Sequence, residues 1–173
     1  SDTSLESMAK LKPAFDKGGV VTAATSSPLT DGAAAVLVCS EKYAKDNNLN
    51  IMAYIRGMAI SGCDPDIMGI GPVLSSMKAL DRAGLKLSDM DFIEMNEAFA
   101  AQSLACVDEL GVDMNKLNVH GGAIAIGHPL GASGARITGK AASLLHNSDK
   151  QYALSTMCVG GGQGCATVLE RSK

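Results

Sequence analysis

The chain has 173 residues, of which 46% are hydrophobic and 19% are charged, and its formal net charge is −3. This length fits one domain, or one domain and part of another, and the composition is too apolar for a disordered chain. Only 3% of the residues are aromatic and no basic run is present, so nucleic acid is not expected as a partner. The sequence has no window of roughly 18 uninterrupted apolar residues, so no membrane span is expected.

The cysteines form an odd set without metal-type spacing, which predicts free thiols and no metal site. They are Cys39, Cys63, Cys106, Cys158 and Cys165. The start Ser1-Asp2-Thr3 carries no signal-peptide core. Together these features predict a chain that works in a reducing cytoplasm.

Residues 1–50 are expected to lie outside the main domain. Residues 1–30 show neither a helical stripe nor sustained alternation, and they resemble the end of a preceding unit. Residues 31–40 (DGAAAVLVCS) form an apolar run after a turn, which predicts a buried strand, and residues 41–47 predict a short polar helix.

Residues 51–173 show strands and helices in regular succession. Strands are predicted at residues 51–60, 91–95, 117–119, 152–158 and 165–171. Helices are predicted from Pro72 to a stop at Gly84, over 97–110 before Gly111, and over 133–147. The predicted fold class is therefore α/β, a five-stranded mixed sheet covered by helices, with its last two strands paired as a hairpin.

Apolar spacing also predicts which helix residues face the core. The first helix should bury Val73, Met77 and Leu80, the second Ala100, Leu104 and Val107, and the third Ile137, Ala141 and Leu144.

Three loops carry side chains suited to chemistry, and two glycine clusters (residues 121–134 and 160–164) accompany them. His128 lies between Gly127 and Pro129, which restricts its backbone and suits acid–base work near neutral pH, although a surface or capping histidine is the simpler interpretation. Cys158 precedes a glycine-rich run whose N–H groups could hold an oxyanion, and the alternative is a buried apolar cysteine. Asn96 follows a strand, and by spacing alone it is a helix cap.

Two other patterns resemble nucleotide sites but lack residues that such sites need. Residues 134–140 (GARITGK) match the start of a phosphate-binding loop, but Ala141 stands where a hydroxyl is needed and the segment carries a helical apolar stripe. The glycines at 127, 131 and 134 form a loose dinucleotide pattern that lacks a suitable preceding strand and a downstream acid.

Considered together, the motifs resemble those of the thiolase family. They are residues 96–99 (NEAF), 121–129 (GGAIAIGHP) and 158–164 (CVGGGQG), in that order, and the similarity extends to residues 7–15 (SMAKLKPAF) and 22–32 (TAATSSPLTDG). His120 departs from the pattern, since many relatives carry asparagine there. The resemblance is to the carboxyl-terminal half: residues 51–173 match the C-terminal domain, and residues 1–50 match the end of the N-terminal half.

The resemblance implies acyl transfer between a 3-ketoacyl-CoA and coenzyme A through a nucleophilic cysteine of the other half, without which this chain should be inactive. His128 would activate that cysteine and bind a thioester oxygen, while Cys158 would act as the second acid–base. Gly160 would donate its N–H to an oxyanion, and Asn96 would hold a water beside His128. Coenzyme A contacts are implied for Ser27, Met68 and Phe99.

The resemblance further implies that coenzyme A and acyl-CoA are substrates, with no permanently bound cofactor. The expected partners are the missing N-terminal half and further copies in a homodimer or tetramer. Biosynthetic acetoacetyl-CoA thiolase is one alternative, and a non-catalytic CoA-binding or assembly domain is another. A decarboxylating condensing enzyme would carry a second histidine where Cys158 lies. Asn96, His128 and Cys158 are expected to converge at one end of the sheet, because strand carboxyl ends share an edge.

Overall fold

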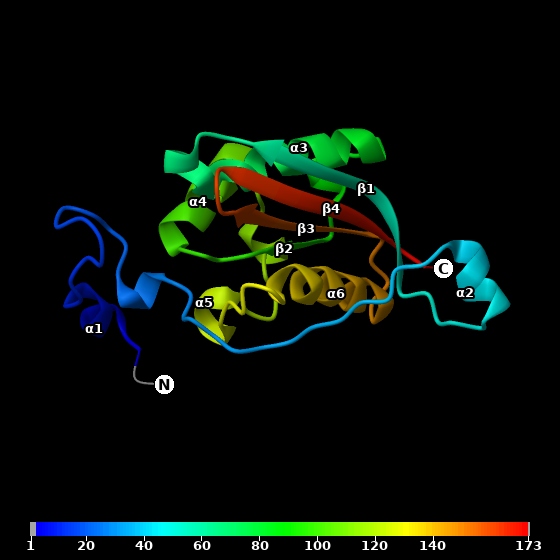
Figure 1. Cartoon of the computed structure of the whole chain (residues 1–173), viewed down its shortest axis with the longest axis horizontal. Coiled ribbons are helices and arrows are strands. Elements are labelled where there is room, and N and C mark those ends of the chain that lie inside the picture. Colours follow the sequence, from blue (N-terminus) through cyan, green and yellow to red (C-terminus); the bar gives the residue numbers. More distant parts are fainter. Residues whose placement is uncertain (1–2, 173) are drawn as a thin grey trace.

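A four-stranded mixed sheet lies between two helical layers in the computed structural model, which describes residues 3–172. The strand order is β1-β4-β3-β2, where β1 is Ala53–Gly62, β2 is Phe92–Met95, β3 is Tyr152–Val159 and β4 is Gln163–Arg171. β4 pairs antiparallel with both β1 and β3, and β2 pairs parallel with β3. The predicted terminal hairpin is thereby confirmed. Figure 1 shows α3 and α4 on one side of the sheet and α6 on the other.

The prediction of a fifth strand at residues 117–119 was wrong. Leu117 forms only an isolated parallel bridge with Ile93. The next residue, Asn118, has φ +44°, which takes the backbone out of the extended region. Its side-chain amide, instead of its backbone, pairs with the N–H and carbonyl of Met95 at 2.9 Å each. A side chain therefore replaces the ladder that a fifth strand would need.

Three longer helices cover the sheet: α3 (Gly71–Ala83), α4 (Ala100–Leu110) and α6 (Ser133–His146). α3 and α4 end at the predicted glycines, since Gly84 and Gly111 take the left-handed conformation with φ near +70°. The shorter helices are α1 (Leu5–Ala9), α2 (Glu41–Asp46) and α5 (Ala123–Ile126), with 3₁₀ turns η1 (Ala23–Thr25), η2 (Pro65–Ile70), η3 (Leu87–Asp89) and η4 (Met114–Lys116).

The buried helix faces agree with the predictions for α6 and only in part for the other two. Ile137, Ala141 and Leu144 are all buried. Met77 and Leu104, however, are 56% and 52% exposed. α3 packs against the sheet through small residues, including buried Ser75, Ser76 and Ala79, and α4 buries Ser103, Cys106 and Val107. In both helices, small side chains occupy the buried face, which therefore differs from the face that hydrophobicity alone predicts.

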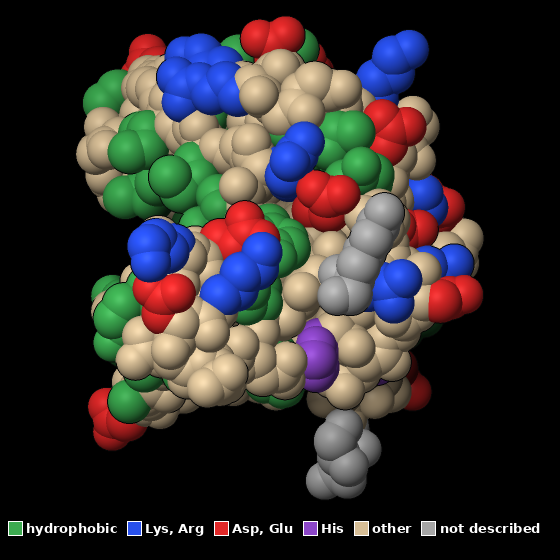
Figure 2. Space-filling model, turned by 90° about the vertical axis from the view of Figure 1, so that its right-hand side faces the viewer, with side chains coloured by type: hydrophobic (Ala, Val, Ile, Leu, Met, Phe, Trp, Pro, Cys, Tyr) green, Lys and Arg blue, Asp and Glu red, His purple; other side chains and the backbone are tan. Residues whose placement is uncertain are grey.

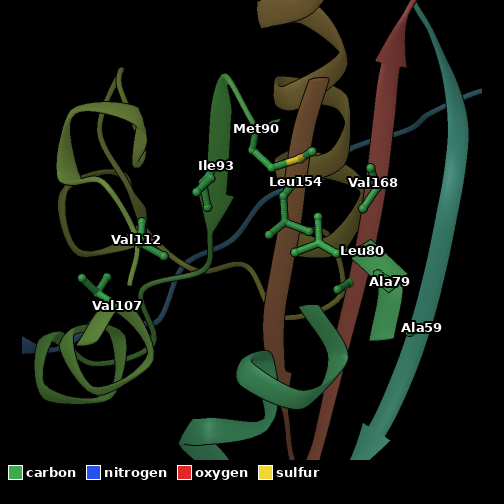
Figure 3. Packing of buried hydrophobic residues seen from close by; sticks show 10 residues of the cluster. Ala59, Ala79, Leu80, Met90, Ile93, Val107, Val112, Leu154 and Val168 are labelled. Atoms are coloured by element: carbon green, nitrogen blue, oxygen red, sulfur yellow. The ribbon is translucent and has the colours of Figure 1, made fainter. Parts of the chain in front are cut away.

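The largest core cluster fills the space between the sheet and the layer of α3 and α4. Figure 3 shows Met90, Ile93 and Leu154 projecting into it from the sheet side, near Leu80 of α3 and Val107 of α4. A smaller cluster on the opposite face joins α6 to β3 and β4 through Ala141, Leu145, Ala153 and Leu169. Both faces of the sheet are therefore buried, as expected for an α/β domain.

Residues 31–40 do not form the predicted strand. All ten are exposed, and the segment runs along the outside of α6 (Figure 1), where Val36 approaches Gly139. Among the strands that the structure describes, none pairs with it. The helix predicted after it is confirmed as α2. Within residues 3–172, no helix is both long and apolar enough to cross a membrane.

Candidate active site

The ends of two parallel strands define one edge of the sheet, and they carry two of the predicted site residues. Asn96 follows β2, and its backbone N–H donates to the Thr156 carbonyl of β3 at 3.0 Å. Cys158 lies two residues further along β3. Both residues are buried, with Asn96 1% and Cys158 7% exposed. The topology therefore brings an amide and a thiol to the edge where ligands bind in α/β sheets.

His128 is held at the same edge by the segment that precedes α6. Gly127 has φ +96°, and a Cβ there would lie 2.3 Å from Oγ1 of Thr30, so only glycine fits. The backbone N–H of His128 donates to that same Oγ1 at 3.2 Å. Asn96 Nδ2 lies 3.4 Å from His128 Nε2, although the two residues are 32 positions apart. The structure thus brings Asn96 and His128 together.

The other ring nitrogen of His128 contacts Ser133. Nδ1 lies 2.6 Å from Oγ of Ser133, and that oxygen lies 3.1 Å from the Pro129 carbonyl oxygen. When the hydroxyl donates to Pro129, Oγ accepts from Nδ1–H, and the imidazole proton is then on Nδ1. In that tautomer Nε2 carries the lone pair, faces the Asn96 amide and can act as a base.

The surroundings shift both titratable site groups toward their neutral forms. Burial lowers the pKa of His128, and the positive charge of Arg136 lowers it further. Burial also raises the pKa of the Cys158 thiol, and nearby Cys63 raises it in addition. A neutral imidazole can act as a base and a protonated thiol as an acid, so each group is in a form that proton transfer requires.

Cys158 and Asn96 lie at the same edge of the sheet, but their side chains belong to different faces of it. Side chains alternate along a strand. Cys158 is therefore on the side of Thr156, which accepts a hydrogen bond from Ser76 of α3. Asn96 continues the side of Phe92, which packs against the cluster under α6. The meeting of Asn96, His128 and Cys158 at one acyl group stays a prediction.

Gly160 lies in the turn between β3 and β4. The turn depends on Gly161 and Gly162, whose φ angles are +86° and +84°. Gly160 is exposed, and a Cβ added to it would meet no atom within 4 Å. Its backbone is accordingly open to a ligand.

Two of the three residues predicted to contact coenzyme A lie side by side. Ser27 donates to the Ala98 carbonyl from its backbone N–H at 3.0 Å and from its hydroxyl at 3.2 Å. Phe99 is the residue after Ala98, and its ring packs edge-on against that of Phe15, with ring centroids 6.3 Å apart. Met68 belongs to η2, which contacts α4. Ser27 and Phe99 therefore lie together at the start of α4, and Met68 belongs to an element that contacts the same helix.

A pocket of about 370 Å³ opens next to His128 and is lined by Leu29, Thr30, Asp31, His128 and Leu130. The pocket gives a small molecule access to the histidine. Within residues 3–172, no group of three or more His, Cys, Asp or Glu side chains is placed to hold a metal ion.

Sequence reasoning missed three supporting residues. Ser133 holds Nδ1 of His128, and Thr30 holds its backbone. Glu97 accepts from Asn118 Nδ2 at 2.6 Å and from the Ile124 N–H at 3.1 Å, so it anchors the loop before His128. For Ser133, its position five residues after His128, at the start of a predicted helix, was the available signal.

Comparison with known proteins agrees with this geometry. The family described as "Thiolase, C-terminal domain" matches residues 49–171, and "Thiolase, N-terminal domain" matches residues 1–42. The chain belongs to the thiolase family. This confirms the resemblance found in the motifs.

Similar thiolases are considerably longer than this chain. It is 56% identical to a 3-ketoacyl-CoA thiolase of Vibrio parahaemolyticus, a match that covers 98% of this chain and 44% of the relative. It is 57% identical to one of Shewanella loihica, with coverage of 99% and 45%. The chain thus spans less than half the length of these relatives.

Two solved structures are similar over 99% of the chain and 44% of their own length. Human mitochondrial 3-ketoacyl-CoA thiolase in complex with CoA has 47% identity and a TM-score of 0.93. Bacillus anthracis acetyl-CoA acetyltransferase has 44% identity and a TM-score of 0.96. These similarities support the α/β thiolase-like fold described above.

Proposed function

We propose that this chain supplies the acid–base half of a 3-ketoacyl-CoA thiolase site. The reaction would cleave a 3-ketoacyl-CoA with CoA into acetyl-CoA and a shortened acyl-CoA. The observation that carries the proposal is the setting of His128, with Nδ1 next to Ser133 and Nε2 facing the Asn96 amide. The similarity to 3-ketoacyl-CoA thiolases over nearly the whole chain supports the substrate class.

His128 would take the proton of a cysteine thiol supplied by the other half. The resulting thiolate would attack the 3-keto carbonyl, and the bond between C2 and C3 would break. The acyl group would stay on the cysteine. The CoA thiol would then attack the acyl cysteine. Its proton would go to Cys158, which is a thiolate after protonating the enolate, and the imidazolium of His128 would return its proton to the released cysteine. The lowered pKa of His128 supports this role because the ring is neutral at neutral pH.

Cys158 would give its proton to the acetyl-CoA enolate that leaves when the bond breaks. Burial keeps this thiol protonated, which supports its role as the acid. The oxygens that become negative need preorganised donors. The backbone N–H of Gly160 would bind one oxyanion, and a water held by Asn96, together with His128, would bind the other. Oδ1 of Asn96 is buried without a hydrogen-bond partner among the described residues, and a water there would satisfy it.

Coenzyme A and acyl-CoA would bind as substrates along Ser27, Met68 and Phe99, with no permanently bound cofactor. The N-terminal half of a thiolase would be the obligatory partner, because it would bring the nucleophile and pair with residues 31–40. Residues 1–50 would then belong structurally to that half and residues 51–173 to the C-terminal domain. We further expect the assembled enzyme to be a homodimer or tetramer.

Acetoacetyl-CoA synthesis is the second candidate function. It is supported by the similarity to the Bacillus anthracis acetyl-CoA acetyltransferase, which has the higher TM-score of the two structures compared. The same groups would serve it in reverse, with Cys158 removing a proton from acetyl-CoA. A chain that binds CoA and shows no chemistry in any assembly would instead be a binding or assembly domain.

The test is reconstitution. The chain is mixed with a polypeptide that covers the part of the Vibrio parahaemolyticus relative preceding the matched region. Thiolysis is followed with acetoacetyl-CoA and with a longer 3-ketoacyl-CoA. The chain alone should show only background turnover, and the mixture should be active. Preference for the longer substrate would favour the degradative function over the acetoacetyl-CoA function.

Variants separate the two proposed roles. Cys158→Ser should slow carbon–carbon cleavage far more than acyl transfer to the nucleophile, and His128→Ala should slow both. Cys165→Ser, on strand β4 of the same hairpin, is the matched control and should retain activity. Turnover by the chain alone, or full activity of Cys158→Ser, would contradict the proposal.

A further inference from the structure

Three buried polar atoms between β2 and α6 have no hydrogen-bond partner among the described residues. They are Oε1 of Glu94, Oδ1 of Asn96 and Nε of Arg136. Glu94 is 5% exposed and Asn96 1% exposed. Glu94 lies on β2 and Asn96 directly follows it. Because the two residues are two positions apart on extended chain, their side chains share the face toward α6. Arg136 lies one turn after Ser133, the residue that holds His128. The unpaired atoms thus belong to one interlayer region that borders the candidate site.

Charges face Glu94 from α6 and from the loop after β2. Arg136 and Lys140 of α6 favour its ionised form, and Glu97 opposes it. From β3, Glu94 is paired in register with Ser155, an uncharged residue that hydrogen-bonds to Thr138. Within residues 3–172, Glu94 forms no ion pair, since the four pairs present involve other residues. Glu94 is affected by charged groups with which it forms no direct ion pair, and such groups can be bridged by water.

Glu97 provides the contrast that shows what a purely structural carboxylate does here. Both of its oxygens accept hydrogen bonds, from Asn118 and from the Ile124 N–H. Glu94 lacks such a partner for Oε1, although it is more deeply buried. Fold stability therefore explains Glu97, while the position of Glu94 two residues before Asn96 calls for another reason.

We propose that Glu94 is a positioning residue of the candidate site, linked by bound water to Arg136 and to the amide of Asn96. This water, separate from the one proposed at the oxyanion, accepts from Arg136 Nε–H and donates to Glu94 Oε1 and Asn96 Oδ1. This arrangement orients the Asn96 NH₂ group toward His128 Nε2. The charge of Glu94 also offsets that of Arg136, which lowers the pKa of His128. The consequence for turnover rests on the proposed function, but the coupling to His128 does not.

The charge of Glu94 changes near neutral pH. Burial raises the pKa of its carboxyl to about 7, against the opposing effects of Lys140 and Arg136. An ionised Glu94 favours the imidazolium form of His128, and a neutral one does not. The His128 ring should therefore report the titration of Glu94 in addition to its own.

The decisive measurement is an NMR titration of the His128 ring nitrogens in the 173-residue chain, which needs no turnover. The wild type should show a second inflection near pH 7, Glu94→Gln should lose it, and Glu94→Asp should retain it. Glu109→Gln, at an exposed position, is the matched control and should titrate like the wild type. Identical His128 curves for wild type and Glu94→Gln would overturn the proposal.

A direct readout guards against a variant that does not fold. The side-chain carboxyl carbon of Glu94 can be titrated in the wild-type chain, and its midpoint should lie well above that of an ordinary glutamate. A midpoint near 4.5, the ordinary value, would overturn the proposal. In the reconstituted enzyme, Glu94→Gln should lower kcat about tenfold with little change in KM, roughly the loss of one well-placed hydrogen bond. If the assembly is inactive, the proposed function fails while the titration still decides the coupling.

Discussion

At the scale of single residues, one histidine depends on contacts from three directions. Ser133 holds its Nδ1, Thr30 holds its backbone and Asn96 lies next to its Nε2. These contacts hold the ring in one direction, while burial and Arg136 lower its pKa. In the proposed function, the imidazole would be in place as a base before substrate binds.

Ser133→Ala should disturb this preparation. The change removes the acceptor of Nδ1–H and the donor to Pro129, both in a fully buried position. We expect a loss of about 1 kcal/mol in the free energy of unfolding, measured with urea, and a shift of His128 toward the Nε2–H tautomer, measured by ¹⁵N NMR. Ser88→Ala, at an exposed position, is the control. A His128 spectrum unchanged in Ser133→Ala would show that Ser133 does not set the tautomer.

Glu94 should make stability depend on pH. Its pKa is about 7 in the folded chain, against an ordinary value of 4.5. Between these values the native state binds more protons than the unfolded state, so this group's contribution to stability falls as pH rises. Glutamine does not titrate. The Tm of Glu94→Gln relative to wild type should therefore increase from pH 5 to pH 8 in thermal unfolding, whereas a constant difference would argue against a raised pKa.

At the scale of elements, glycines allow α3 to lie close to the sheet. A Cβ on Gly164 of β4 would lie 2.0 Å from the Gly71 carbonyl oxygen, and one on Gly71 would lie 2.3 Å from that of Gln163. Gly57 of β1 plays the same part, since its Cβ would lie 2.4 Å from the Ala79 carbonyl. The small buried residues of α3 and these glycines together allow the helix to pack closely against β1 and β4.

Gly164→Ala should consequently be costly. The obstructing atoms are backbone, so the helix or the strand must move. We expect a loss of about 3 kcal/mol or more, the upper end for overpacking, measured as a lower urea midpoint. Gly131→Ala is the matched control, because a Cβ there meets nothing within 4 Å and its φ is not positive. Equal stability of the two variants would contradict the close packing of α3.

At the scale of the whole molecule, much apolar surface is exposed. Leu37 and Val38 are 74% and 68% exposed in the segment that runs along α6, and Ile60 of β1 is 67% exposed. Figure 2 shows further hydrophobic side chains between charged groups on one end of the molecule. Because extended apolar surface usually marks an interface, these residues fit the proposal that a second thiolase half covers them.

Replacing Leu37 and Val38 with serine tests this assignment. Both side chains are exposed in the chain alone, so its Tm should change little. Reconstitution with the N-terminal half should weaken at least tenfold in apparent affinity, measured by titrating one part against the other, because two buried side chains are each expected to contribute about 1.5–3 kcal/mol. Met114→Ser, at another exposed apolar position, should leave the affinity unchanged. Unaltered affinity of the double variant would remove residues 31–40 from the interface.

Local chemistry made most of the elements predictable. The stops of α3 and α4 followed from Gly84 and Gly111, and the terminal hairpin followed from two apolar runs around a glycine cluster. The inward face of α6 followed from its periodicity. Where the predictions failed, a tertiary contact prevailed: the Asn118 side chain took the place of a fifth strand, and small residues displaced Met77 and Leu104 from the core.

The sequence alone determined the family and the candidate residues, because the motifs around Asn96, His128 and Cys158 are local strings of specific residues. Only the tertiary structure decided that Asn96 lies beside His128, that Ser133 contacts Nδ1 of His128, and that Glu94 is buried between β2 and α6. The physical reason is that pairing of β2 with β3 and packing of α6 bring together residues distant in the chain. Contact distances and burial, which determine proton positions and pKa values, exist only once those layers have formed.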